Sequence, residues 1–370
     1  MIKELVHTPD GVRDIYGEEE QRKLYLEDAI KKVIYTYGYE DIQTPTFEYF
    51  DVFSKEIGTT PSKDLYKFFD KEGDTLVLRP DFTPSVARCA SKYFSDETAP
   101  IKLTYLGNTF VNNSSLQGKL KEVTEIGVEF MNDDSAMADA ETINLCIEAL
   151  KATGLKDFQI AIGQMEYFKG LCDNAGISED NELLLREYIS SKNYVLAEEL
   201  IDSLINDSVS KELLMMTGEY MGDASVICNL KARVNNDRSK QALERLEEVY
   251  ELLKLFGNEK YVSFDLGMLS KYNYYTGIIF KAYAYGLGDV LVKGGRYDHL
   301  LEAFGNSKPA VGFVIVVDDL MLALRSAHIT VPVKGKPEIV TYNVSNVREK
   351  LEYVCKLRKE GKAVSLVAEV

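Results

Sequence analysis

The chain has 370 residues, of which 45% are hydrophobic and 28% charged, as expected for a globular protein with a large buried core. Its 59 acidic residues outnumber its 43 basic ones and give a formal net charge of −16. Because such a surface repels phosphate backbones, a broad nucleic-acid-binding face is excluded unless basic residues cluster locally. The longest apolar run, at 311–317, is too short to cross a bilayer, so no membrane partner is expected.

Cysteine and histidine are poorly placed for metal or disulfide chemistry. The five cysteines include no Cys-x-x-Cys pair, and the three histidines show no i, i+4 spacing. Neither a disulfide framework nor a metal site is predicted, and no cofactor is expected. The first residues, MIKELVHTPDG, lack the apolar segment of a signal peptide, so a reducing, cytoplasmic location is the expectation.

Short strands and helices are predicted to follow one another in the first 160 residues or so. Thr83 is expected to be the N-cap of one helix, with Pro84 at its first helical position. The predicted elements are a helix at 18–37, a hairpin at 65–79, a helix at 83–94, strands at 101–111 and 121–131, and a helix at 135–153.

Composition changes at about Gly163, beyond which strand character is rare and leucines recur at helical spacing. The pattern predicts a helical insertion at about 166–256 within a body at 1–325, then a linker at 326–336 and a strand–helix–strand fragment at 337–370. Strand signals return after the insertion, at 261–266, 274–285, 289–295 and 310–317. Strands adjacent in sequence, combined with a few helices, predict an α+β fold with a largely antiparallel sheet.

Phosphate-binding motifs are incomplete. Gly286-Leu287-Gly288 lacks the third glycine of a dinucleotide fingerprint, and the GGRYD run at 294–298 fits either a turn beside a ligand or a strand-to-helix corner. Asp318 and Asp319 end an apolar strand, as in the ribose-phosphate site of type I phosphoribosyltransferases. Leucines follow them instead of a glycine-containing loop, which favours two acids at a helix N-terminus.

Two carboxylates are predicted to share one face of a sheet. In the strand at 121–131, period-two alternation places Glu125 and Glu129 on either side of Gly127. Burying both without compensation is costly. Either a cationic ligand, such as an amino group or imidazolium, or an ion-pair network with Arg79 and Arg88 would offset that cost.

Seven motifs together carry a family resemblance over about 8–325. In this order, the chain resembles the class II histidyl-tRNA synthetases, which implies a mainly antiparallel six-stranded sheet flanked by helices, usually in a homodimer. The motifs are PDGVRD at 9–14, GYEDIQTPTFE at 38–48, LRPDFT at 78–83, EIGVEF at 125–130, YYTGIIF at 274–280, GGRYDHL at 294–300 and PAVGF at 309–313.

Three positions depart from that family where it binds ATP. By the resemblance, Val111 replaces an arginine that holds the α-phosphate, Ser270 one that promotes adenylation, and Asp319 one that clamps ATP. Adenylyl transfer depends on fixed cations aimed at developing negative charge, so the nucleotide site is expected to be lost. The C-terminal fragment is also shorter than the synthetases' anticodon-binding domain, so no tRNA partner is expected.

A synthetase-like body without these arginines resembles the regulatory subunits of ATP phosphoribosyltransferase. That resemblance implies a non-catalytic protein that activates a short-form catalytic subunit and conveys histidine feedback in the first step of histidine biosynthesis. It also implies histidine as the effector. The implied histidine-binding residues are Asp81, Thr83, Glu125, Glu129, Tyr274 and Tyr275. The resemblance implies a glutamine where Glu125 stands.

Three alternatives remain open on the sequence. The chain could be an active synthetase with an unusual nucleotide site, or a self-sufficient phosphoribosyltransferase using Asp318 and Asp319. It could also be a histidine-sensing paralogue that serves another partner.

Overall fold

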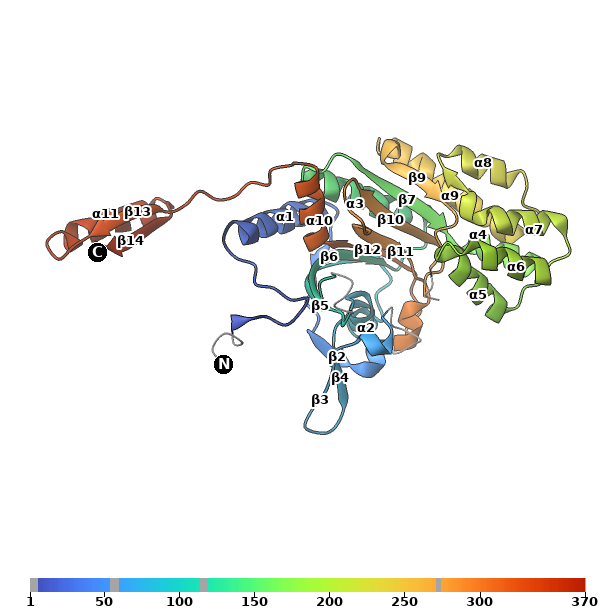
Figure 1. Cartoon of the computed structure of the whole chain (residues 1–370), viewed down its shortest axis with the longest axis horizontal. Helices are drawn as coiled ribbons and strands as arrows, with labels where there is room; N and C mark the ends of the chain where they lie inside the picture. Colours follow the sequence, from blue (N-terminus) through green and yellow to red (C-terminus); the bar gives the residue numbers. More distant parts are fainter. Residues whose placement is uncertain (1–5, 54–59, 114–118, 271–273, 370) are drawn as a thin grey trace. The chain divides into compact units, whose positions relative to one another are not determined.

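The computed structural model describes residues 6–53, 60–113, 119–270 and 274–369. The chain divides into two compact units, one formed by 1–14 and 26–331 and the other by 15–25 and 332–370, so the division falls within helix α1 (Gly17–Thr36). The first unit carries a large sheet and a helical insertion (Figure 1). The mixture of helices with a mainly antiparallel sheet confirms the predicted α+β class.

A nine-stranded sheet forms the centre of the first unit. Its six central strands, from β5 to β7, pair antiparallel throughout, as expected. Outside these six strands, β1 and β9 add parallel pairs at the two sides and β8 extends the second side. In spatial order the strands are β1 (Glu40–Asp41), β5 (Ile101–Phe110), β6 (Glu122–Met131), β12 (Ala310–Val316), β11 (Val292–Arg296), β10 (Ile278–Ala284), β7 (Phe158–Gln164), β9 (Val262–Asp265) and β8 (Met221–Gly222).

Alternation along β6 gives the sheet two different faces. Ile126, Val128 and Phe130 point into the main apolar core, together with residues of α1 and α3 (Ala136–Ala152). The intervening residues of β6 face the other side and form part of the candidate site. Helix α3 begins where the Ser135 side chain accepts the Ala138 N–H, at 3.2 Å.

A small antiparallel sheet of β2 (Phe47–Tyr49), β4 (Thr75–Leu78) and β3 (Lys67–Phe69) confirms the predicted hairpin and adds one strand to it. Helix α2 (Thr83–Tyr93) follows β4, and its N-cap is Phe82 rather than Thr83. Thr83 is not the cap because its hydroxyl donates to a carboxylate on β6 instead. Of the two alternatives for the run at 294–298, a tight turn at the glycines is wrong, because Gly294 and Gly295 lie within strand β11. The run leads instead from β11 toward the 3-10 turn at Leu300–Phe304.

The helical insertion lies between β7 and β9, interrupted by the short strand β8 (Figure 1). Side chains of Asn193, Asp207 and Asn236 cap three of its helices by accepting main-chain N–H groups. The helices are α4 (Met165–Asn174), α5 (Glu179–Ser190), α6 (Tyr194–Leu204), α7 (Ser208–Met215), α8 (Ser225–Lys231) and α9 (Asp237–Leu255). Helix α10 (Val317–Ser326) follows β12, and 3-10 turns occur at Phe50–Phe53, Ser62–Asp64, Met216–Glu219 (η5), Glu259–Tyr261 and Leu300–Phe304.

The second unit contains β13 (Glu338–Tyr342), α11 (Val347–Lys359) and β14 (Val364–Ala368). The two strands pair in parallel, which requires the crossover that α11 supplies. A small apolar cluster holds them together: Val340, Val354, Leu357 and Val364.

Candidate functional site

The site lies on the sheet face that carries Glu125, Gly127 and Glu129. Tyr105 on β5 stands opposite Gly127, and Gly312 on β12 stands opposite Glu129. A Cβ atom at Gly127 would overlap the Tyr105 hydroxyl, and one at Gly312 would overlap the Glu129 carboxylate. Glycine at these two positions therefore leaves the space that the polar side chains occupy.

Glu129 is the centre of a hydroxyl network. Its side chain is 1% exposed and accepts hydrogen bonds from Thr83 Oγ1 at 2.8 Å, Tyr105 at 3.4 Å and Tyr297. Burial raises the pKa of Glu129 to about 8, although the hydroxyl donors favour its ionised form. The carboxyl is thus poised to change charge near neutral pH.

Glu125 lies four residues before Glu129 on the same face of β6 and is partly buried. Burial and the nearby charge of Asp81 raise the pKa of Glu125 to about 8, while Lys293, Thr109 and Arg79 oppose the shift. At pH 7 its carboxyl is therefore mostly protonated and carries one O–H donor.

Neither arginine proposed as a partner neutralises this pair by direct contact. Arg79 donates to the main-chain carbonyls of Asn108, at 2.8 Å, and Thr44, at 3.0 Å, and its guanidinium stacks 4.0 Å from the Phe82 ring. Arg88 pairs with Glu48 at 2.8 Å. Among the described residues, neither arginine therefore forms a direct ion pair with Glu125 or Glu129.

Asp81 and Thr83 join the site at the turn between β4 and α2. The Asp81 carboxylate accepts the Thr83 N–H at 3.0 Å, which directs the Thr83 hydroxyl toward Glu129. Between them, Phe82 stacks on Tyr105 with ring centroids 4.4 Å apart. The turn therefore brings a carboxylate and a hydroxyl from a distant part of the sequence onto β6.

Tyr274 and Tyr275 supply the aromatic part, with ring centroids 4.2 Å apart. Tyr274 also lies 6.1 Å from the Tyr297 ring, and a Cβ atom at Gly295 would come within 2.6 Å of the Tyr275 ring. The structure thus brings all six predicted residues close together. The charge of Asp81 contributes to the raised pKa values of Glu125, Glu129 and Tyr274.

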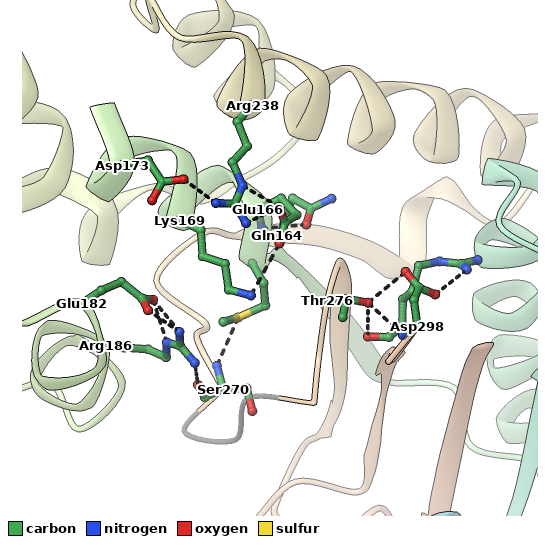
Figure 2. A network of polar contacts seen from close by, with 12 residues as sticks. Gln164, Glu166, Lys169, Asp173, Glu182, Arg186, Arg238, Ser270, Thr276 and Asp298 are labelled. Atoms are coloured by element: carbon green, nitrogen blue, oxygen red, sulfur yellow. Dashed lines mark hydrogen bonds and ion pairs between the residues drawn. The ribbon is translucent and has the colours of Figure 1, made fainter. Parts of the chain in front are cut away.

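Two polar anchors hold the chain on either side of the tyrosines (Figure 2). On one side, the Thr276 hydroxyl donates to Asp298 at 2.9 Å, and Arg296 bonds to both Asp298 and the buried Asp139. Because Tyr297 lies between Arg296 and Asp298, this anchor also orients the hydroxyl that reaches Glu129.

The second anchor comes from the helical insertion. Arg186 on α5 is 2% exposed, pairs with Glu182 at 2.7 Å and donates to the Ser270 carbonyl at 3.5 Å (Figure 2). The Ser270 N–H donates to the sulfur of Met165 at 3.4 Å. The insertion therefore fixes the main chain shortly before Tyr274.

The three positions proposed to have lost a nucleotide-binding arginine lie at a strand end, in a loop and at a helix start. The Val111 N–H donates to the Lys121 carbonyl at 2.9 Å, just after β5. Asp319 lies in the first turn of α10, and burial with the nearby charges of Asp289 and Asp318 raises its pKa. Asp318 accepts the Thr124 N–H at 2.8 Å, which gives that acid a structural role.

Sequence reasoning missed Tyr105 and the role of Tyr297 as donors to Glu129. The signal for Tyr105 was its register opposite a glycine, which appears only once strand pairing is known. Across the described ranges, no three histidine, cysteine or acidic side chains gather as metal ligands. Nor do the helices in those ranges include one that is both long and apolar enough to span a membrane.

Comparison with known proteins shows the family to which this chain belongs. The family model of histidyl-tRNA synthetases matches residues 11–320. An ATP phosphoribosyltransferase regulatory subunit from Acetivibrio thermocellus is 40% identical over 362 residues, covering 98% of this chain and 86% of that protein. The chain belongs to the family of ATP phosphoribosyltransferase regulatory subunits, which is built on the histidyl-tRNA synthetase fold. A regulatory subunit from Caldanaerobacter subterraneus is 39% identical over 362 residues, covering 98% of this chain and 94% of that protein.

Solved structures of this family and of the synthetases share the architecture. One described as an ATP phosphoribosyltransferase regulatory subunit/histidyl-tRNA synthetase from Bacillus halodurans has a TM-score of 0.90 at 33% identity, covering 98% of this chain and 93% of that chain. A histidyl-tRNA synthetase from Nostoc has a TM-score of 0.82 at 22% identity, covering 99% and 86%, which reflects the common fold. The class II synthetase-like fold is thereby confirmed.

Proposed function

We propose that this chain is a non-catalytic regulatory subunit that activates a short-form ATP phosphoribosyltransferase catalytic subunit and conveys feedback inhibition by histidine in histidine biosynthesis. Membership of the regulatory-subunit family supports this role. The proposal depends on a difference between two sets of residues in the same fold. The acidic and aromatic residues implied for histidine binding lie close together around Glu129, whereas Val111, Ser270 and Asp319 supply no cation for ATP.

Histidine is the ligand that this pocket suits. Its α-ammonium or imidazolium cation would face Glu129 and Asp81, and Tyr274 and Tyr275 would offer aromatic faces. A cation beside Glu129 favours the ionised carboxylate, so binding at pH 7 would release a proton from a group whose pKa is about 8.

Glu125 can take the place of the amide that the synthetase resemblance implies there. A carboxyl with a pKa of about 8 is mostly protonated at pH 7 and presents one O–H donor beside one acceptor oxygen. A glutamine side chain likewise presents donors beside an acceptor. Glu125 in its protonated form would therefore preserve the hydrogen-bonding pattern that histidine needs.

Isothermal titration calorimetry with histidine tests the pocket. We expect Glu129→Gln to weaken histidine binding by at least about tenfold and Glu125→Gln to leave it within about threefold. Glu122→Gln is the matched control, because Glu122 lies on the same strand with its side chain bonded to Asn108 instead. Equal affinity in the Glu129→Gln and native chains would overturn the assignment of this pocket.

Mixing with the short-form catalytic subunit tests the regulatory role. The chain alone should show neither phosphoribosyl transfer nor histidine-dependent ATP–pyrophosphate exchange, and turnover should rise on mixing and fall again with histidine. Measuring mass at the same time tests the proposed homodimer and its assembly with the catalytic subunit. Transferase activity of the isolated chain would contradict the proposal.

A further inference from the structure

A separate hollow lies in the helical insertion, among α5, α6, α7 and the turn η5. Its volume is about 470 Å³, and Ile189, Ile201 and Leu214 form part of its apolar lining, with Met215 and Met216. None of these residues belongs to the pocket around Glu129. Methionine side chains adapt their shape to a partner, so such a floor suits an inserted apolar group.

Acidic side chains surround this apolar floor. Glu198, Glu212 and Glu219 line the hollow, together with Lys211. Glu212 pairs with Arg233 at 2.7 Å, and Lys211 pairs with Asp202, so these charges are already matched. Among the ion pairs of the described residues, none includes Glu198 or Glu219. Two exposed carboxylates therefore remain available at the rim.

The segment that surrounds the hollow is strongly acidic. Residues 179–223 contain eleven acidic and three basic side chains, a net charge of −8, which is half of the −16 of the whole chain. Large apolar side chains are exposed on the same helices, including Tyr194 at 43%, Val195 at 67% and Val209 at 45%. Exposed apolar groups bordered by charge are typical of an interaction surface.

We propose that this hollow is the docking site for a segment of a partner protein that carries an apolar side chain flanked by lysine or arginine. The apolar side chain would fill the hollow above Ile201 and Met215, and its basic neighbours would lie against Glu198 and Glu219. Such a segment relieves the mutual repulsion of the acidic residues, whereas an acidic segment would increase it. The inference stands independently of the proposed histidine function.

A labelled helical peptide of leucine and lysine, titrated into the full chain, tests this site by fluorescence anisotropy. We expect saturable binding that weakens with salt, and no comparable binding of a peptide in which glutamate replaces each lysine. Glu198→Lys with Glu219→Lys should weaken binding of the lysine peptide by at least about tenfold. Equal binding of both peptides, or none of the lysine peptide, would overturn the proposal.

A matched pair of substitutions separates a local site from general charge attraction. Glu72→Lys with Glu349→Lys changes the net charge by the same amount at exposed positions outside the insertion and should leave the affinity within about twofold. If this pair weakens binding as much as the rim pair, the attraction is non-specific and the proposal fails.

A shape variant tests the hollow itself. Ala197, which is 4% exposed, lines the hollow, so Ala197→Met should occupy part of it and weaken the peptide by about tenfold. Circular dichroism and a melting temperature within about 2 °C of the native value would show an intact fold. Concentration-dependent self-association that Ala197→Met abolishes would assign the hollow to a second copy of the chain and overturn the partner assignment.

Discussion

Two groups of residues, those around Glu129 and those at Val111 and Asp319, differ in how firmly the structure holds them. Around Glu129, three hydroxyls and two strategically placed glycines constrain a buried carboxyl from several strands. At Val111 and Asp319, half-buried side chains follow a strand end or begin a helix. Residues of the second kind are therefore expected to tolerate substitution without a large cost in stability.

The strongest test of this contrast is Gly312→Ala. Its methyl group would overlap the Glu129 carboxylate and the Val128 carbonyl, so we expect a loss of about 3 kcal/mol in the free energy of unfolding, measured with urea. Gly288→Ala is the control, because a Cβ atom there meets no neighbour within 4 Å. If the Gly312→Ala chain is as stable as this control, the residues around Glu129 can rearrange to accept the added methyl group.

Arg296→Met tests the anchor beside the tyrosines. It leaves Asp139, which is 0% exposed, paired only with Arg245 among the arginines that contact it here, and should cost about 3 kcal/mol in thermal or urea unfolding. Histidine affinity should fall as well, because Thr276 and Tyr297 lose their orientation. Arg348→Met, at a side chain that is 93% exposed, should leave both measurements unchanged.

The pH dependence of stability tests the two carboxyls. Because Glu125 and Glu129 have folded-state pKa values of about 8 against a usual 4.5, the folded chain binds more protons than the unfolded chain between these values. Stability should therefore fall as pH rises from about 5 to about 8, by up to about 1.4 kcal/mol per pH unit for each proton. Urea midpoints across this range should flatten in the Glu125→Gln, Glu129→Gln double variant, and an unchanged slope would contradict the raised pKa values.

Asp319→Arg should have the smallest effect. The raised pKa of Asp319 shows that its negative charge is not strongly favoured, while its place in the first turn of α10 favours an acid by about 0.3–1 kcal/mol. We expect stability to change by less than about 1 kcal/mol, with Asp319→Asn as the control for loss of charge alone. A loss of stability as large as that expected for Gly312→Ala would remove the distinction between the residues around Glu129 and those at Val111 and Asp319.

Much of the fold and the site could be predicted from local patterns. The spacing of Glu125, Gly127 and Glu129 assigned them to one face of a strand, and the structure has that arrangement. The hairpin at 65–79 and the helix after Pro84 also followed from turn and capping residues. The parallel pairing of β1 and of β9 was not predicted, because strand pairing depends on residues distant in sequence.

Thr83 shows where local reasoning fails. A threonine before proline at a helix start is a strong capping signal, yet its hydroxyl donates to Glu129, 46 residues later in the sequence. The buried carboxyl gains a third hydroxyl donor in this way, and hydrogen bonds to a buried carboxyl offset part of the cost of its burial. Arg88 likewise pairs with a residue distant in the sequence, Glu48, and not with Glu125 or Glu129.

The sequence by itself determined the α+β class, the helical insertion, and the composition of the pocket, because periodicity and motif order reside in neighbouring residues. The tertiary structure decided which groups surround each charge: hydroxyls around Glu129, main-chain carbonyls around Arg79, and an insertion arginine at Ser270. Half of the net charge of −16 lies in residues 179–223. These residues surround a hollow that only packed helices can form. Burial and charge environment depend on chain segments that meet in space, and this is why the sequence alone left them open.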